Sequence, residues 1–122
     1  MMKLASLVLS ISILLLSFGL VVVSSSLVSA SSRVIRVPQD FGTIQEAVNS
    51  ANSGDVIYVQ SGTYREHVIV NKSNLTLVGE NRNTTTIDGQ GADTILLKAD
   101  NITVCGFTLT QGYSGVQIYP WT

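Results

Sequence analysis

The chain has 122 residues, with seven Lys and Arg against eight Asp and Glu, and its only cysteine is Cys105. This length holds one domain at most, and the charge argues against a nucleic-acid partner, because phosphate binding needs clustered cations. A single cysteine also excludes the intramolecular disulfides on which small exported domains often depend. The domain must therefore be held together in another way, or must be part of something larger.

The first thirty residues have the layout of a secretory signal peptide. A positive start at Lys3 precedes the uncharged run from Leu4 to Val23, and Val28-Ser29-Ala30 has the small residues of a cleavage site. The run is also just long enough to span a bilayer, so an uncleaved anchor is the alternative. We therefore divide the chain into a leader, residues 1–30, and one mature domain, residues 31–122. We expect that domain to be secreted, extracellular or on the cell surface, with membrane contact only through an uncleaved leader.

One short amphipathic helix is predicted near the start of the mature domain. Thr43 and Glu46 have the spacing of a capping box, in which each side chain bonds the backbone amide of the other residue. Apolar residues then recur at helical spacing through residues 44–51. Asn52-Ser53-Gly54 follows, and these residues tolerate the left-handed backbone that ends many helices.

Short strand-like segments make up the rest of the chain. Each is rich in β-branched residues and is bounded by Gly, Asn, Asp or Ser. Good hairpin signals are missing, which disfavours an antiparallel sandwich. The predicted strands are Val56 to Val59, His67 to Val70, Leu75 to Val78, Thr85 to Ile87, Thr94 to Leu97, Ile102 to Val104, Phe107 to Leu109 and Val116 to Tyr119.

A repeat indicates how these strands are arranged. Residues 67–79 align with residues 94–106 without a gap, at an offset of 27. A fixed period of this size is typical of stacked architectures, and short strands without a helix inside the repeat favour a chain that coils. We therefore expect Leu77 to lie beside Val104 in an aliphatic column. The structural repeat residues are two equivalent pairs, Asn74 with Asn101 and Gly79 with Gly106.

The predicted fold is all-β, a right-handed single-stranded parallel β-helix of three to four coils. The helix over residues 44–51 is expected to cap its N-terminal end. No comparable element follows the strand at Val116, so we expect a bare C-terminal end, as in a truncated β-helix. Such an end is a row of unpaired backbone groups and favours edge-to-edge self-association.

Four motifs carry a family resemblance. The chain resembles the opening of pectin-lyase-fold β-helix proteins, both the NosD-like and related carbohydrate-associated repeat proteins and the pectinesterases. The resemblance covers residues 34 to 112. Its motifs are Val37-Pro-Gln-Asp-Phe-Gly-Thr-Ile-Gln-Glu-Ala-Val48, Gly54-Asp-Val-Ile-Tyr-Val59, Gly62-Thr-Tyr-Arg-Glu66 and Leu75-Thr-Leu-Val-Gly79.

The resemblance also implies what this segment lacks. Pectinesterases and related lyases carry their catalytic carboxylates and arginine on later coils, so no catalytic residue is carried over to this sequence. The motif residues Gly62, Tyr64 and Glu66 are expected to be structural: a turn glycine, a packed ring and a local hydrogen-bond acceptor.

Metal and acid–base chemistry have little support in the pattern. His67 is the only histidine, and one imidazole without a second ligand makes a weak metal site. Asp88, Asp93 and Asp100 are more often turn formers than calcium ligands, so no cofactor is expected and calcium is the open alternative. Glu80 and Asp88 are candidates for acid–base work by residue type alone.

Four N-glycosylation sequons are the strongest modification signal, and all fall at predicted turns. Asn and Thr are also common in β-helix turns and strands, so chance occurrence is an equal alternative. An inward ladder of Asn74 and Asn101 would prevent glycosylation of those two residues. The candidate acceptors are Asn71, Asn74, Asn83 and Asn101.

These observations predict a secreted or surface β-helix scaffold, associated with carbohydrate and non-catalytic on its own. Its expected partner is a polysaccharide or a cell-surface glycan. The alternative is the N-terminal fragment of a pectinesterase- or polysaccharide-lyase-like enzyme whose catalytic coils are missing.

Overall fold

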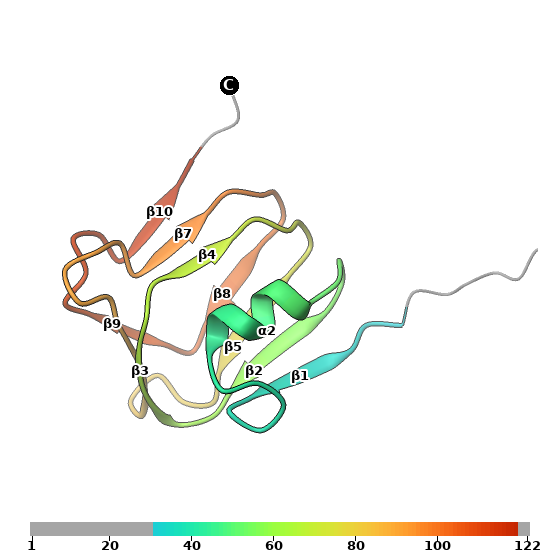
Figure 1. Cartoon of the computed structure of the whole chain (residues 1–122), viewed down its shortest axis with the longest axis horizontal. Coiled ribbons are helices and arrows are strands. Elements are labelled where there is room, and N and C mark those ends of the chain that lie inside the picture. The colour runs from blue at the N-terminus through green and yellow to red at the C-terminus, as the bar shows by residue number, and fades with distance from the viewer. Residues whose placement is uncertain (1–30, 120–122) are drawn as a thin grey trace, which may run out of the picture.

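The computed structural model describes residues 31–119, and within them the chain forms one helix and ten short strands (Figure 1). The leader and anchor predictions concern residues 1–30 and lie outside the described residues. No helix in the described part is long and apolar enough to cross a membrane. The elements are β1 (Val34–Val37), α2 (Ile44–Ser50), β2 (Val56–Val59), β3 (Gly62–Arg65), β4 (Val68–Val70), β5 (Thr76–Gly79), β6 (Thr85–Asp88), β7 (Ile95–Leu97), β8 (Thr103–Cys105), β9 (Thr108–Thr110) and β10 (Val116–Ile118).

The strands form three parallel sheets, and each full coil of the chain adds one strand to each sheet. The first sheet has the order β1-β2-β5-β8, the second β3-β6-β9, and the third β4-β7-β10. Every recorded strand pair is parallel, and the two partners always come from successive coils. The predicted all-β parallel β-helix, which is right-handed like nearly all parallel crossovers, is confirmed.

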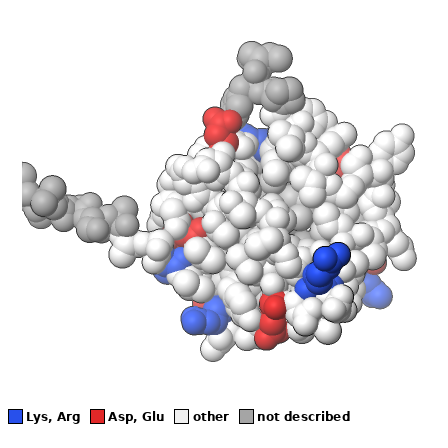
Figure 2. Space-filling model, turned by 180° about the vertical axis from the view of Figure 1, so that it is seen from behind, with Lys and Arg blue, Asp and Glu red and all other residues white. Residues whose placement is uncertain are grey.

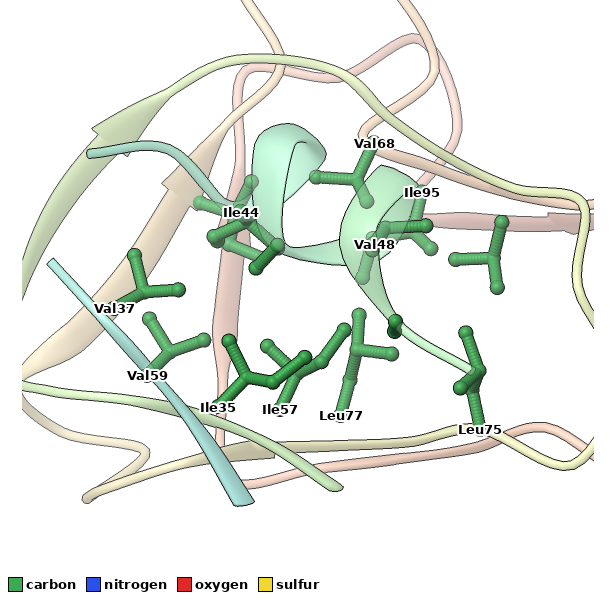
Figure 3. Close-up of a cluster of buried hydrophobic side chains, with 14 of the residues drawn as sticks. Ile35, Val37, Ile44, Val48, Ile57, Val59, Val68, Leu75, Leu77 and Ile95 are labelled. Atoms are coloured by element: carbon green, nitrogen blue, oxygen red, sulfur yellow. The ribbon is translucent and has the colours of Figure 1, made fainter. Parts of the chain in front are cut away.

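Alternate residues of each strand point inward and stack into aliphatic columns. In the first sheet Ile35 pairs with Ile57, Ile57 with Leu77, and Leu77 with Val104. The predicted proximity of Leu77 and Val104 is therefore confirmed. Figure 3 shows Ile35, Ile57 and Leu77 on the side of the core opposite Val68 of the third sheet and Val48 of α2. Fully burying one aliphatic side chain stabilises the fold by about 1.5–3 kcal/mol, so the columns supply what disulfides supply in other small domains.

The helix α2 covers the N-terminal end of this core. Its capping box is present: the Glu46 amide donates to Thr43 Oγ1, and the Thr43 amide donates to Glu46 Oε2, both at 3.2 Å. Ile44, Ala47 and Val48 are buried beneath it. The helix ends differently from the prediction, because its C-cap Ala51 is extended and the left-handed backbone comes only at Gly54.

Coil length is not constant, although the aligned repeat suggested a single period. Val56 pairs with Thr76, 20 residues further on, whereas Thr76 pairs with Thr103, 27 residues further on. The strands stay in register because the additional residues of the longer coil lie in the turns between strands. Two strands, β1 and β3, were not predicted, and the other boundaries moved by one residue or not at all.

Candidate functional site

Glu66 anchors the N-terminus of α2. Its carboxylate accepts hydrogen bonds from the first two helical amides, Ile44 N on Oε1 and Gln45 N on Oε2, each at 2.9 Å. Amides at a helix start have no partner inside the helix, and the positive end of the helix dipole favours a carboxylate there. Glu66 is thus a structural acceptor, as the motif predicted, and its partners belong to the helix of the previous coil.

Gln45 connects the same helix to the free edge of β4. Its side-chain amide donates to Ile69 O at 3.1 Å, and its Oε1 accepts from Ile69 N at 2.7 Å. The edge of β4 is therefore closed by a side chain that imitates a neighbouring strand. Lys72 completes the contact at the other end of α2, where its Nζ donates to the carbonyls of Asn49 and Ala51.

Tyr64 is the packed ring of the motif. Its hydroxyl donates to Gln60 O at 2.8 Å, and its ring lies against Gly62 and the aliphatic core. Partial burial, together with the Glu66 and Glu80 carboxylates, raises the pKa of Tyr64. Gly62 is the first residue of β3 and not a turn glycine, because it pairs with Thr85 of the next coil.

These residues form one assembly, the helix-docking corner, which we define as Gln45, Gly62, Tyr64, Glu66 and Lys72. A family model described as Pectinesterase matches residues 36–111, a range that includes the whole corner. The chain belongs to the pectinesterase family. A cell surface glycoprotein of Methanothermus fervidus is 33% identical over 84 residues, which make up 67% of this chain but only 14% of that relative. No solved structure matches the chain.

In this pectinesterase-family chain Glu80 belongs to a polar group beside the corner. Its Oε2 accepts from Ser61 Oγ and from Ser61 N, both at 2.7 Å, and Ser61 Oγ lies 2.8 Å from Thr84 Oγ1. The hydroxyl and amide of Ser61 lower the pKa of Glu80. A carboxylate whose ionised form is stabilised in this way is a weaker base. The bonds to Ser61 instead connect two successive coils.

Asp88 has different partners from Glu80, so the two acid–base candidates are not assembled into a pair. Its Oδ1 accepts from Gln90 N at 3.0 Å, which is the local turn bond expected of an aspartate. Its Oδ2 lies 3.9 Å from Nε of the exposed Arg65. No hydrogen bond or ion pair joins Asp88 to Glu80 within residues 31–119.

The side chains of His67, Asp93 and Asp100 do not form one cluster. The exposed imidazole of His67 places Nδ1 3.1 Å from Asp93 O, at the edge of the coil. The Asp100 amide donates to Ser73 Oγ at 3.3 Å. Between Ser31 and Tyr119, no three His, Cys, Asp or Glu side chains form a group that could hold a metal ion.

The predicted asparagine ladder of this family member is present, and it lies on an exposed turn. Asn101 Nδ2 donates to Asn74 Oδ1 at 2.7 Å, and Asn74 Nδ2 donates to Ser53 Oγ at 2.8 Å. Both asparagines have left-handed backbones, with φ of 60° and 54°. All four sequon asparagines are exposed, so the inward ladder that would exclude glycosylation is not formed.

The repeated glycines allow the closest approach between two coils. A Cβ added to Gly79 would lie 2.1 Å from Gly106 O, and one added to Gly106 would lie 2.3 Å from Gly79 O. Their neighbour Cys105 pairs with Val78 and is exposed, so the thiol is on the outer face and not in the core.

Within residues 31–119 of this pectinesterase-family chain, no further coil lies over β8, β9 and β10. Val116 and Ile118 continue inward columns of the third sheet, where Val68 and Ile95 are fully buried, yet they are 45% and 71% exposed. We call this surface the open end. Its inward-facing residues are Ile102, Val104, Phe107, Leu109, Val116 and Ile118.

The sequence pattern identified the motif residues but not their partners. The roles of Gln45 and Lys72 depend on where α2 lies relative to β4, which no local pattern specifies. No local pattern predicted the role of Asp55 either. Its buried carboxylate accepts hydrogen bonds from the backbone amides of Arg33 and Asn52, at 3.0 and 2.9 Å. The family resemblance marked these segments as motifs but did not indicate that they contact each other.

Proposed function

We propose that the chain is a non-catalytic β-helix scaffold segment of an exported, carbohydrate-associated surface protein. The helix-docking corner is the observation that carries the proposal. Both carboxylate oxygens of Glu66 bind the helix start, and the Tyr64 hydroxyl binds Gln60 O. The polar groups of the family motif therefore hold coils together, and the scaffold needs no cofactor.

Surface placement is supported by the relative and by the leader-like start of the sequence. The similar protein of Methanothermus fervidus is named a cell surface glycoprotein, and the chain spans about one-seventh of its length. The experiment expresses the tagged full chain in a host with an export pathway and labels intact cells with a membrane-impermeant reagent. Labelled chain is the expected result, and chain confined to the cytoplasm would overturn the placement.

Carbohydrate association is supported by exposed aromatic rings near the open end. Tyr113 is 89% exposed and Tyr119 is 54% exposed, and rings with one apolar face and a polar tip suit contact with sugars. Affinity electrophoresis of the exported chain in gels that contain surface polysaccharide should show retardation that Tyr113→Ala weakens. Thr63→Ala, on an exposed position of β3, is the matched control. Equal mobility with and without polysaccharide would reject this part of the proposal.

Glycosylation of the sequons belongs to the same proposal. Asn71 and Asn83 are exposed and their side-chain amides bond no other described residue, whereas Asn74 and Asn101 are joined in the ladder. We therefore expect sugars first at Asn71 and Asn83. Peptide mapping of the exported chain by mass spectrometry, before and after chemical deglycosylation, tests each site, and four unmodified asparagines would contradict the expectation.

The family match favours a second candidate, the N-terminal part of a pectinesterase- or lyase-like enzyme. Incubating the exported chain with methyl-esterified polygalacturonate separates the two functions. The scaffold releases no methanol and forms no unsaturated uronate, and release of either product would establish an enzyme. Sequencing the gene past Thr122 adds an independent test. Later coils that carry aligned Asp, Asp and Arg residues would favour the enzyme over the scaffold.

A further inference from the structure

A polar pocket lies beside the start of β1, next to the loop that joins α2 to β2 (Figure 1). Its volume of about 500 Å³ is within the range of small-molecule sites, but its lining differs from theirs because it contains no large apolar side chain. A ligand must therefore be held mainly by hydrogen bonds. The lining residues are Ser31, Ser32, Arg33, Asn52, Ser53 and Asp55.

Asp55 is the buried member of this lining, with an exposed fraction of 4%. Its Oδ1 accepts from the backbone amide of Arg33 at 3.0 Å, and its Oδ2 accepts from the backbone amide of Asn52 at 2.9 Å. These two bonds fix the carboxylate between β1 and the loop before β2. Because a carboxylate oxygen has more than one lone pair, Asp55 can still accept a hydroxyl hydrogen from a ligand without moving.

Arg33 supplies donors at the mouth of the pocket. Its Nη2 donates to Ser50 O at 3.2 Å and lies 3.5 Å from Asp55 Oδ2, which holds the guanidinium in place. The hydrogens on its Nε and Nη1 bond no other described residue, and the side chain is 54% exposed. A fixed guanidinium with free N–H groups can therefore bind the oxygen atoms of a ligand.

Ser53 connects the pocket to the asparagine ladder. Asn101 donates to Asn74, and Asn74 Nδ2 donates to Ser53 Oγ at 2.8 Å, so every side-chain bond of the ladder runs toward the serine. Ser53 is thus an acceptor in the ladder. Its own hydroxyl hydrogen has no acceptor among the described residues, and it is available to a ligand in the pocket.

The charges of the lining select the class of ligand. Arg33 and Asp55 are its only charged residues, and their charges are opposite. Figure 2 likewise shows no large area of one sign, because acidic and basic side chains are interspersed at the margins of the face that it presents. Asp55 would repel an anion, whereas a neutral polyol offers hydroxyl groups that both donate and accept.

We infer that this pocket, which we call the Ser53 pocket, binds a neutral sugar residue. The inference rests on the carbohydrate association proposed above and gives it a site separate from the exposed tyrosines. Two sources can supply such a residue: a surface polysaccharide or a glycan attached to the chain itself. Both present the same hydroxyl groups to Arg33, Ser53 and Asp55.

Nuclear magnetic resonance of the isotope-labelled full exported chain tests the inference. The chain is produced in a host that adds no sugars and is titrated with the methyl glycosides of glucose, galactose, mannose and N-acetylglucosamine. The backbone amides of Arg33 and of residues 52–55 should shift in a saturable way with at least one glycoside. Galacturonate, which carries a carboxylate, should bind more weakly than that glycoside.

The variant Asn52→Ala removes a side-chain amide from the pocket. It keeps the backbone amide that binds Asp55, so the fold should be unchanged. We expect sugar affinity to fall about fivefold, which corresponds to the loss of one neutral hydrogen bond. Asn71→Ala, an exposed asparagine outside the pocket, is the matched control and should bind like the natural chain.

The same spectra distinguish the failure of the pocket from that of carbohydrate association. Shifts confined to Tyr113, Tyr119 and their neighbours would overturn the pocket and leave the association in place. Absence of any shift, tighter binding of galacturonate, or unchanged affinity of folded Asn52→Ala would also overturn the inference. In a glycosylated preparation, pocket amides that are already shifted and no longer respond to added sugar would identify the chain's own glycan as the occupant.

Discussion

Glu66 binds the amide of Ile44 across one coil of the chain, and this bond fixes where the capping helix begins. Replacing Glu66 with Ala leaves two helix-terminal amides without their charged acceptor. Hydrogen bonds to charged groups contribute about 1.5–3 kcal/mol, so we expect a loss of about 2 kcal/mol in the free energy of unfolding. Urea denaturation followed by circular dichroism measures it. Glu66→Gln keeps one acceptor oxygen and should lose about half as much; equal losses for the two variants would contradict this role.

Asp55 should make the stability of the fold depend on pH in acid. The Asn52 amide, and then the Arg33 amide and charge, lower the pKa of this buried carboxyl from its ordinary value of 3.8, against the opposing effect of burial. Because the folded pKa lies below the unfolded one, the stabilisation is complete above the unfolded value and is lost as the pH falls through the folded value.

The variant Asp55→Asn removes this titration. We expect it to be less stable than the natural chain at neutral pH and to lose less stability on acidification. Urea midpoints measured from about pH 2 to about pH 7 compare the two. Parallel curves for the variant and the natural chain would show that another group causes the acid dependence.

Asn74 has two separable effects on stability, its left-handed backbone and its place in the ladder. Asn74→Gly keeps the backbone and removes the amide, and should cost about 1 kcal/mol. Asn74→Ala also places a less tolerant residue at φ of 60°, which adds about 1 kcal/mol. Asn71→Ala, on the same turn but outside the ladder, should change stability by less than about 0.5 kcal/mol. The interpretation fails if the Gly variant is the less stable of the two at position 74.

Gly79 lies where two coils touch through their backbones. An added Cβ would lie 2.1 Å from Gly106 O, and backbone cannot move aside as a side chain can. We expect Gly79→Ala to destabilise the fold by about 3 kcal/mol or more. Gly42→Ala is the control, because its Cβ would lie 3.7 Å from the nearest atom, Glu46 Oε2. Thermal unfolding should separate the two variants clearly, and similar melting temperatures would rule out the clash.

The coiled architecture could be predicted because like residues repeat where coils stack. Two positions of the coil accept few residue types because of their backbone geometry. The same residue therefore occurs at each of them in both coils, Asn at 74 and 101 and Gly at 79 and 106. The strand β3 could not be found in this way. Thr63 and Tyr64 favour a strand, but they are only two residues and follow a glycine, which does not. The strand forms because Gly62 and Tyr64 pair with Thr85 and Ile87 of the next coil.

For a related reason, the local sequence pattern could not predict the hydrogen-bond partners of the motif residues. In the sequence, Glu66 is an isolated acidic residue before the predicted strand that starts at His67, and Gln45 is a polar position of the predicted helix. Each acquires its role only when the helix is placed across the end of the coil. Periodicity predicts that the helix has an apolar face, but it does not specify which strand edge lies beneath that face.

The unequal coil lengths have a consequence for how this fold can change. The strands that line the core stay in register whether 20 or 27 residues separate them, so the cross-section is independent of the length of the corners. Insertions at an exposed corner such as Gln90-Gly91, where both residues already have positive φ, are therefore tolerated more readily than a single added residue within a strand. New surface features can be acquired by lengthening corners while the interior stays as it is.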